Sequence, residues 1–275
     1  MLNFLKNELL SRGIDTFGVI SLKKCRVVRE YKLKKCGFDD LSDLSVIMLA
    51  IPYYTHHKEK NISSYAIPRD YHAYCKELFG SLIPLLNGKF EGYRFAGFAD
   101  DSPIDERDAA ARSGIGVLGE NQLILTEKYS SYIFLAELIT DYPLECNGAG
   151  DIKKCHGCMA CRRACPAGEI GECLSSLTQK KGELTKAESD KIKRYGSAWG
   201  CDICQEVCPY TKKAIENGTI LTPIEFFKES LIPCPSSGFI DGMSDCDFSL
   251  RAYSWRKRET VRRNLLILED KTSKE

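Results

Sequence analysis

The first half of the chain alternates continuous apolar runs with amphipathic segments. Residues 45–54 (SVIMLAIPYY) form an apolar run with polar flanks, which predicts a buried strand. Residues 17–21 predict another strand, whereas residues 2–12 and 70–86 repeat their apolar positions with a helical period. We therefore expect a sheet that packs against helices.

Further strands and one helix complete this half. Additional strands are predicted at residues 93–100, 122–128 and 131–140, the last two joined by a short turn. Residues 104–114 predict a helix, with Ser102 as its N-cap and Pro103 at its first position. Gly114 marks the end of that helix. This order of elements is typical of an α/β or α+β fold, and we expect a mixed sheet.

The second half of the chain has a different amino-acid composition. Cysteine, glycine and charged residues dominate from residue 146 to about residue 210, before a loop-rich stretch at 232–247 and a short basic helix at 251–269. We therefore predict three parts, namely an α/β domain, a cysteine-rich domain, and a loop-rich segment with a helical tail. Their predicted ranges are residues 1–145, 146–215 and 216–275.

Composition and charge narrow the class of protein. The 275 residues are 43% hydrophobic and 28% charged, and the formal net charge of +1 gives no global field that favours nucleic acid or membrane. A run of about 18 apolar residues, which could span a bilayer, is absent. The N-terminus also lacks a signal-peptide pattern. We expect a cytoplasmic protein.

Fourteen cysteines in such a chain suggest metal or redox chemistry, because a reducing cytoplasm disfavours structural disulfides. The first cluster of them is Cys155-x2-Cys158-x2-Cys161-x3-Cys165, followed by Pro166. This spacing matches the bacterial ferredoxin run, in which three thiolates hold one 4Fe–4S cluster and the fourth reaches another cluster. Zinc is the alternative, although zinc sites prefer separated CxxC pairs or cysteine with histidine.

A second run supplies Cys201, Cys204 and Cys208, followed by Pro209. Two 4Fe–4S clusters need eight thiolates, and the two runs provide seven, so Cys173, which lies between them, is the best candidate for the eighth. The alternative is a 3Fe or water-ligated second cluster with Cys173 merely buried. The two predicted ligand sets are Cys155, Cys158, Cys161 and Cys208, and Cys165, Cys173, Cys201 and Cys204.

Two familiar cofactor motifs are weak or fail in the region before the clusters. The glycines of SGIGVLGEN (113–121) satisfy GxGxxG, but they follow a helix instead of a strand, so a dinucleotide site is weakly indicated. The corrinoid motif DxHxxG begins with Asp70 and His72 but fails because Cys75 occupies the glycine position.

Two polar segments remain as candidates for a catalytic site. YAIPRDYH (65–72) gathers charged and aromatic side chains at a helix start, and FADDSP (98–103) puts Asp100 and Asp101 at the end of a strand. Ligand sites in open α/β sheets lie at the carboxyl ends of strands, and a carboxyl group there could serve as a proton donor. The alternative is that one of the two aspartates caps the following helix.

Several blocks, taken in order, resemble the epoxyqueuosine reductase family, which carries out the last step of queuosine synthesis in tRNA. The blocks are YAIPRDYH, FADDSPIDERDAAARSGIGVLGENQLIL, SSYIFLAELITDYPLE, and both cysteine runs with ECLSSLTQKKGEL between them. The resemblance covers roughly residues 45–210 and resumes near 251–268.

The resemblance implies a cofactor for each domain. The first domain would bind base-off cobalamin without a protein ligand from below, and a ferredoxin-like domain would pass electrons from two 4Fe–4S clusters to cobalt. Aligned on Pro103, the family's acid falls on Asp100, and a family cysteine falls on Cys173. The residues that the resemblance associates with the cobalamin are Arg69, Asp70, Tyr71, His72, Asp100, Asn121, Ser131 and Glu137.

The resemblance also implies tRNA and an unidentified electron donor as partners, and we expect a monomer. Family members have a C-terminal helical-repeat domain that helps hold tRNA, and the chain stops soon after RRNLLILED, so we expect a short member. A basic tail with Tyr253 and Trp255 interleaved could bind RNA phosphates and stack on a base. Its cations are Arg251, Arg256, Lys257, Arg258, Arg262 and Arg263. The alternative is an amphipathic helix that packs on the body through Leu250, Val261, Leu265 and Leu268.

The leading hypothesis is a cobalamin-dependent reductase with two 4Fe–4S clusters that converts epoxyqueuosine to queuosine in tRNA. Two alternatives stay open. One is a related corrinoid and iron–sulfur reductase that acts on another small substrate. The other is a non-catalytic electron-transfer protein with two clusters and no corrinoid.

Overall fold

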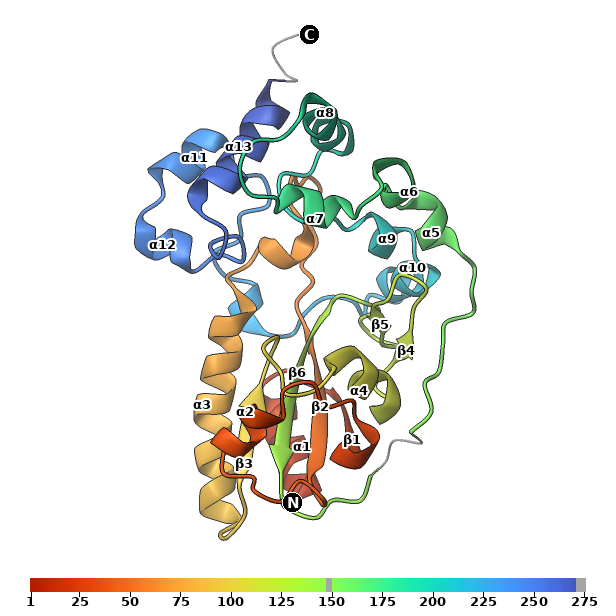
Figure 1. Ribbon diagram of the computed structural model, residues 1–275, viewed down its shortest axis with the longest axis vertical. Helices are drawn as coiled ribbons and strands as arrows, with labels where there is room; N and C mark the ends of the chain where they lie inside the picture. Colours follow the sequence, from red (N-terminus) through yellow and green to blue (C-terminus); the bar gives the residue numbers. More distant parts are fainter. Residues whose placement is uncertain (147–149, 271–275) are drawn as a thin grey trace. The chain divides into compact units, whose positions relative to one another are not determined.

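The computed structural model describes residues 1–146 and 150–270 (Figure 1). Residues 147–149, beside the predicted domain boundary, and residues 271–275, at the end of the predicted tail, lie outside the described residues. The chain divides into two units, here called the sheet unit and the helical unit. The sheet unit contains Met1–Tyr53, His72–Cys158 and Tyr210–Ile224, and the helical unit contains Tyr54–Tyr71, Met159–Pro209 and Glu225–Glu275. The division into 1–145, 146–215 and 216–275 stays a prediction.

Four strands form the main sheet of the sheet unit. They are β1 (Thr16–Ser21), β2 (Ser45–Pro52), β3 (Phe95–Phe98) and β6 (Ile133–Thr140), in the order β1-β2-β6-β3. Every neighbouring pair is antiparallel, so the prediction of a mixed sheet is wrong. The reason is that β6 inserts between β2 and β3, which a helix connects and which run in the same direction.

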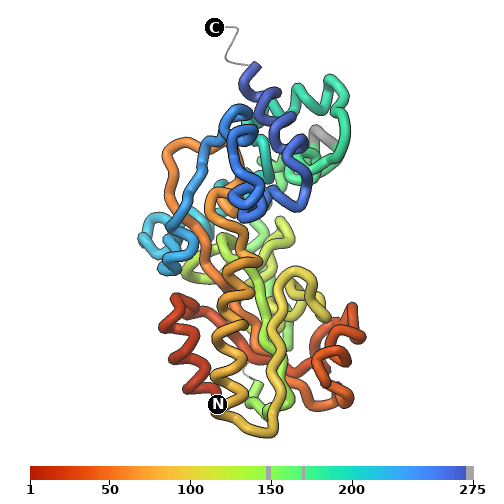
Figure 2. The backbone as a smooth tube through the Cα atoms, turned by 90° about the vertical axis from the view of Figure 1, so that its left-hand side faces the viewer, coloured from red at the N-terminus to blue at the C-terminus, as the bar shows by residue number. Residues whose placement is uncertain are grey.

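Helices cover both faces of this sheet. β2 is buried at all eight positions, as its continuous apolar run predicts. Its residues Val46, Met48 and Ala50 belong to a core that includes side chains of α2 (Glu30–Lys35) and α4 (Glu106–Ser113). Figure 2 shows α1 (Leu2–Ser11) and α3 (Tyr71–Lys89) on the other side of the sheet. The helices and strands predicted at residues 2–12, 17–21, 45–54 and 70–86 are thus confirmed, with ends shifted by up to three residues.

The helix predicted at residues 104–114 is α4, and its end at Gly114 is confirmed by a left-handed φ of 82°. Its N-cap, however, is Asp105, whose side chain accepts the Asp108 N–H. The prediction of Ser102 as the cap is wrong, because the Ser102 hydroxyl donates to Glu137 instead.

A short hairpin follows α4 and explains the glycine-rich stretch. It consists of β4 (Val117–Leu118) and β5 (Ile124–Leu125), which pair with each other, so the strand predicted at 122–128 is confirmed only over its two residues Ile124 and Leu125. A Cβ at Gly116 would lie 2.7 Å from the Leu125 carbonyl oxygen, and one at Gly119 would lie 2.4 Å from Asn121 Oδ1. These glycines therefore serve close packing within the hairpin.

The helical unit consists of short helices and connecting loops. Its α-helices are α5 (Ala160–Ala164), α6 (Ala167–Ile170), α7 (Leu174–Thr178), α8 (Lys186–Tyr195), α9 (Ile203–Glu206), α11 (Ser237–Gly242), α12 (Asp245–Ser249) and α13 (Arg258–Glu269). Its 3-10 turns are η2 (Ser64–Ala66) and η3 (Glu225–Phe227), and the sheet unit also has η1 (Leu22–Lys24) and α10 (Pro209–Glu216). The core of the helical unit packs Trp199 and Tyr253 against Val261 and Leu265 of α13.

The basic helix predicted at 251–269 begins at Arg258, because residues 251–257 form turns around the buried Tyr253. Across the residues that the structure describes, we find no helix with the length and hydropathy that crossing a membrane requires.

Candidate functional site

The loop between β3 and α4 carries the predicted acid. Asp100 lies two residues after the end of β3 and has a φ of 63°, which is unusual for a residue other than glycine. Its carboxyl group is 70% exposed and lies 3.6 Å from His72 Nε2, at the start of α3. Its backbone N–H donates to Glu106 Oε1 over 3.1 Å. Asp100 and His72, both predicted site residues, therefore meet in the sheet unit.

The neighbouring Asp101 is held differently. Lys32 of α2 forms an ion pair with its carboxylate, and Arg29 Nη1 lies 3.6 Å from the same carboxylate. The hydrogen bond from Lys32 and the charges of both cations lower the pKa of Asp101 below its ordinary value. Asp101 is therefore held in its charged form by Lys32 and Arg29. Neither Asp101 nor Asp100 caps α4, whose N-cap is Asp105.

A pair of carboxyl groups, one fully buried and one partly exposed, contacts this loop. Glu137 of β6 is fully buried, and Glu106 is the first residue of α4. Burial raises the pKa of Glu106 to about 7 and that of Glu137 well above its ordinary value. The Glu106 carboxyl raises the pKa of Glu137 further, whereas the hydrogen bond with Glu137 lowers the pKa of Glu106. Sequence reasoning missed Glu106. The sequence held a signal for it, because Glu137 is the lone acid in the apolar strand IFLAELIT. A buried acid of this kind needs a polar partner.

Two other predicted residues lie near the short hairpin and the start of β6. Asn121 Oδ1 accepts the Leu123 N–H over 3.2 Å, whereas Asn121 Nδ2 is buried and has no acceptor among the described residues. Ser131 is 5% exposed and lies two residues before the start of β6. Asn121 thus offers a buried donor that a ligand could use.

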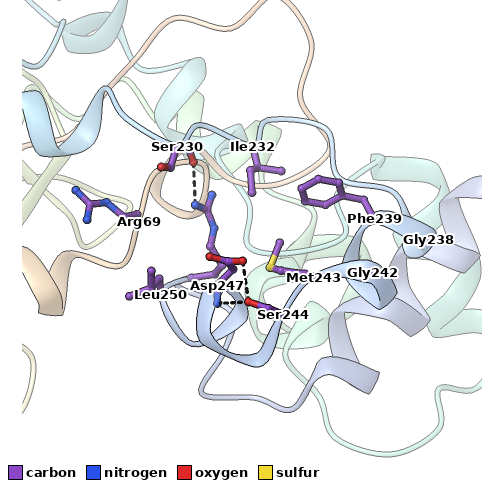
Figure 3. Close-up of a pocket in the computed structure, with 11 residues that line it drawn as sticks. Arg69, Ser230, Ile232, Gly238, Phe239, Gly242, Met243, Ser244, Asp247 and Leu250 are labelled. Atoms are coloured by element: carbon purple, nitrogen blue, oxygen red, sulfur yellow. Dashed lines mark hydrogen bonds between the residues drawn. The ribbon is translucent and has the colours of Figure 1, made fainter.

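The predicted residues Arg69, Asp70 and Tyr71 belong to the helical unit, where Arg69 lines a cavity of about 450 Å³ (Figure 3). Its guanidinium carbon lies 4.1 Å from the centre of the Phe226 ring, and Nη2 pairs with Glu229 over 3.1 Å. Arg69 Nε is buried without an acceptor among the described residues. Figure 3 shows Arg69 at one end of the lining and Phe239 at the other.

The predicted cluster cysteines are divided between the units. Cys155 and Cys158 belong to the sheet unit, and the other six belong to the helical unit. Cys165 follows α5 and Cys173 precedes α7, and the charges of both act on Cys201. Burial raises the pKa of the Cys201 thiol to about 11. The structure therefore brings three members of one predicted ligand set into the same part of the helical unit.

Asp202 anchors the segment that carries Cys201 and Cys204. It is 5% exposed and accepts the Ser64 N–H over 2.7 Å and the Ser64 hydroxyl over 2.8 Å. The Ser63 hydroxyl donates to it as well, and Lys60 forms an ion pair with it. Sequence reasoning missed this residue, because its partners lie 138 to 142 positions earlier in the chain.

Much of the basic tail is used inside the helical unit. Arg251 is 3% exposed and donates to the carbonyls of Ser230 and Ile67, so its predicted contact with RNA phosphate is wrong. The other engaged cations are Arg258 with Asp245, Arg262 with Asp241, and Arg263 with the Lys180 carbonyl. The alternative of a packed helix is confirmed for Val261 and Leu265.

Comparison with known proteins gives the family. The family described as "Epoxyqueuosine reductase QueG, DUF1730" matches residues 42–101. The chain is 30% identical over 259 residues to the epoxyqueuosine reductase of Listeria monocytogenes, covering 83% of this chain and 65% of that protein. It is 31% identical over 208 residues to that of Bacillus subtilis, covering 72% and 53% respectively. The chain therefore spans less than two thirds of the length of these relatives.

Solved structures agree with these matches. A crystal structure of selenomethionine-labelled epoxyqueuosine reductase matches 98% of this chain and 82% of its own chain, with a TM-score of 0.73 and 25% identity. A crystal structure of epoxyqueuosine reductase with an epoxyqueuosine-modified tRNA-Tyr stem loop matches 98% of this chain and 81% of its own, also with a TM-score of 0.73 and 25% identity. The mixed α/β fold with its antiparallel sheet is thus that of known epoxyqueuosine reductases, and the chain belongs to the epoxyqueuosine reductase family.

Proposed function

We propose that this protein is an oxidoreductase that converts epoxyqueuosine to queuosine in tRNA. The relatives from Listeria monocytogenes and Bacillus subtilis both carry the name epoxyqueuosine reductase. The structure obtained with an epoxyqueuosine-modified tRNA stem loop matches 98% of this chain. This likeness over nearly the whole chain is the observation that carries the proposal, and it makes tRNA the proposed partner.

Eight cysteines are the proposed ligands of two 4Fe–4S clusters. The nearness of Cys165 and Cys173 to Cys201 supports the second set, which Cys204 completes. Within residues 1–146 and 150–270, no three His, Cys, Asp or Glu side chains converge closely enough to hold a single metal ion. A cubane takes one thiolate at each of four separate iron atoms, so its ligands stand further apart than those of one ion. The first proposed set is Cys155, Cys158, Cys161 and Cys208.

Cobalamin is the proposed third cofactor, and when bound it would supply a redox-active cobalt. The buried donors of Asn121 Nδ2 and Arg69 Nε, which have no acceptor among the described residues, suit a ligand rich in amide carbonyls and phosphate oxygens. Glu137 is fully buried, so its proposed contribution is indirect. The remaining proposed binding residues are Asp70, Tyr71, His72, Asp100 and Ser131.

Asp100 is the proposed proton donor of the reaction. Its carboxyl group is exposed, whereas that of Asp101 is tied to Lys32 and Arg29. His72 lies 3.6 Å away, and an imidazole is the side chain best suited to pass a proton near neutral pH. We therefore assign delivery of the proton to Asp100 and its resupply to His72.

Nucleoside analysis of tRNA tests the proposal in cells. A strain that lacks this protein should accumulate epoxyqueuosine at the expense of queuosine, as measured by liquid chromatography and mass spectrometry. The wild-type gene should restore queuosine, and Asp100→Asn should not. Glu127→Gln, which changes an exposed acid elsewhere in the sheet unit, is the matched control and should restore it. Unchanged queuosine in the deletion strain, without epoxyqueuosine, would remove the tRNA assignment.

Cobalamin binding separates this proposal from its alternatives. An anaerobically reconstituted protein that binds no cobalamin, as judged by absorbance, would favour a non-catalytic electron-transfer protein. Binding without turnover of epoxyqueuosine tRNA would favour a corrinoid and iron–sulfur reductase for another small substrate. The proposal further expects an unidentified electron donor, a monomer and a cytoplasmic location.

A further inference from the structure

The loop that carries Asp100 turns tightly between β3 and α4. The Asp101 N–H donates to the Ala99 carbonyl over 2.8 Å, and the Ser102 N–H donates to the Asp100 carbonyl over 2.8 Å. Asp100 has a left-handed φ of 63°, a conformation that a residue other than glycine keeps only while its surroundings hold it. The contacts that hold this loop from outside therefore determine where the Asp100 carboxyl group lies.

The chain around the start of α2 holds the loop by three successive carbonyl groups. Lys32 Nζ donates to the Asp101 carbonyl over 2.7 Å, and Arg29 Nη1 donates to the Ser102 carbonyl over 2.9 Å. Two backbone N–H groups of the same segment donate to the Pro103 carbonyl over 2.8 and 3.0 Å. One short segment of the sheet unit thus supplies both side-chain and backbone donors to the loop.

Lys32 is engaged more closely than an ordinary surface lysine. Its side chain is 15% exposed, whereas that of Arg29 is 44% exposed. Besides the Asp101 carbonyl, its ammonium group contacts the carboxylate of the same residue in an ion pair. Charge-assisted hydrogen bonds are stronger than neutral ones, and low exposure limits their screening by salt. Lys32 therefore fixes both the main chain and the side chain of the residue next to Asp100.

The loop has other outside restraints, which act on either side of these two carbonyl contacts. An acid of α4 accepts the Asp100 N–H, and an acid of β6 accepts the Ser102 hydroxyl. Backbone N–H groups from the α2 segment reach the loop only at Pro103. Among the described residues, Lys32 and Arg29 are therefore the only donors to the two carbonyl groups that precede Pro103.

We propose that Lys32 and Arg29 are positioning residues for Asp100, which hold the loop by these carbonyl groups so that the Asp100 carboxyl stays beside His72. This inference rests on the acid role proposed for Asp100. Both cations act through the main chain of the loop, and neither contacts the reacting groups. Loss of either cation lets the acid sample other positions, so proton delivery becomes slower although the acid is still present.

Hydrogen–deuterium exchange of the full-length, reconstituted protein tests this hold without substrate. In Lys32→Met, which removes the charge and keeps an unbranched side chain, peptides over residues 95–106 should exchange about tenfold faster than in the wild type. Arg29→Met should act in the same direction with a smaller effect, because its side chain is more exposed. Lys34→Met is the matched control. Lys34 lies on the same helix and pairs with Glu30 over 2.7 Å, so its loss should leave the loop unchanged.

Turnover of tRNA that contains epoxyqueuosine separates positioning from other roles. In Lys32→Met, kcat should fall by about tenfold while KM for tRNA stays within about twofold. A raised KM with unchanged kcat would assign Lys32 to RNA binding instead. The variant that combines Lys32→Met with Asp100→Asn should be no slower than Asp100→Asn alone, because the acid to be positioned is gone. A merely structural lysine would slow both backgrounds by the same factor.

Two results would overturn the proposal. One is unchanged loop exchange in folded Lys32→Met and Arg29→Met, and the other is equal slowing of kcat in the two backgrounds. Circular dichroism shows whether each variant folds, and Arg29→Met decides the matter if Lys32→Met does not fold. A wild type that makes no queuosine would remove the proposed function, whereas the exchange measurements would still report on the hold of the loop.

Discussion

The sheet unit and the helical unit are stabilised by different kinds of contact. In the sheet unit, β2 is buried along its whole length, and apolar side chains of the sheet pack against α2 and α4. In the helical unit, α5 and α7 have five residues each and α9 has four. Helices of that length are not stable in isolation. Apolar burial over a sheet therefore specifies the first unit, and the second needs additional connections.

Buried polar side chains provide those connections. Asn264 of α13 is fully buried and donates to the Thr178 carbonyl over 2.6 Å and to the Ala198 carbonyl over 2.8 Å. Asp202 joins the segment around Cys201 to residues Lys60, Ser63 and Ser64 in the same way. One polar side chain thus holds several loops, so its removal should cost more than that of an ordinary surface contact.

The largest effect is expected at Asp202. In Asp202→Ala, the donors of Ser63 and Ser64 lose their buried acceptor and Lys60 loses one of its two carboxylate partners. Breaking such a buried network should lower the free energy of unfolding of the helical unit by about 3–5 kcal/mol. Denaturant unfolding, with hydrogen exchange at residues 60–66 and 199–206, measures this. The exposed Asp190→Ala on α8 is the control, and an equal loss in both variants would contradict the comparison.

A smaller effect is expected in the sheet unit when the pH rises. Burial raises the pKa of Glu106 to about 7 from an ordinary 4.5, so its protonated form favours the folded state. The resulting stability is fully present below the ordinary pKa and is lost as the pH rises through about 7. At roughly 1.4 kcal/mol per pKa unit, the loss is about 3 kcal/mol. Urea unfolding across this range should show a weaker pH dependence in Glu106→Gln, which removes the titrating group. An equal pH dependence of the unfolding free energy in the wild type and in the variant would refute Glu106 as its source.

These two regions also differ in how well the sequence predicts them. The strand at 45–54 and the helix at 70–86 were predictable, because buried apolar residues recur with a clear local period. The antiparallel arrangement was not, since the insertion of β6 between β2 and β3 depends on pairing between residues far apart. Ser102 has the local pattern of a helix cap, but Glu137 takes its hydroxyl.

The candidate site shows the same limit. Cysteine spacing predicted both ligand sets, and the nearness of Cys165, Cys173 and Cys201 supports one of them. Asp202 and Glu106 were not predicted as important, because each acquires its role from partners on distant segments. The RNA-binding role of the tail was predicted from its cations and interleaved aromatic residues, a pattern that does not reveal that Arg251 is buried.

The smallest effect is expected at Trp255, on the surface of the helical unit. Its side chain is 60% exposed, and the Arg256 guanidinium lies 3.9 Å from the centre of its ring. If this surface stacks on an RNA base, Trp255→Ala should weaken binding of a tRNA stem loop by about 1 kcal/mol. Fluorescence anisotropy at fixed salt measures the affinity. Tyr31→Ala, at an exposed aromatic of the sheet unit, should change nothing, and equal affinities for both variants would contradict the assignment.

The most direct test of the central claim is turnover of tRNA that contains epoxyqueuosine by the purified, anaerobically reconstituted protein, followed by mass spectrometry of its nucleosides. The wild type should produce queuosine. Asp100→Asn should be slower by about 10²–10⁴-fold, the range expected for loss of a general acid, while its cluster and cobalamin absorbance stays the same. No queuosine from a wild-type protein with its cofactors bound, or full activity in Asp100→Asn, would contradict the account.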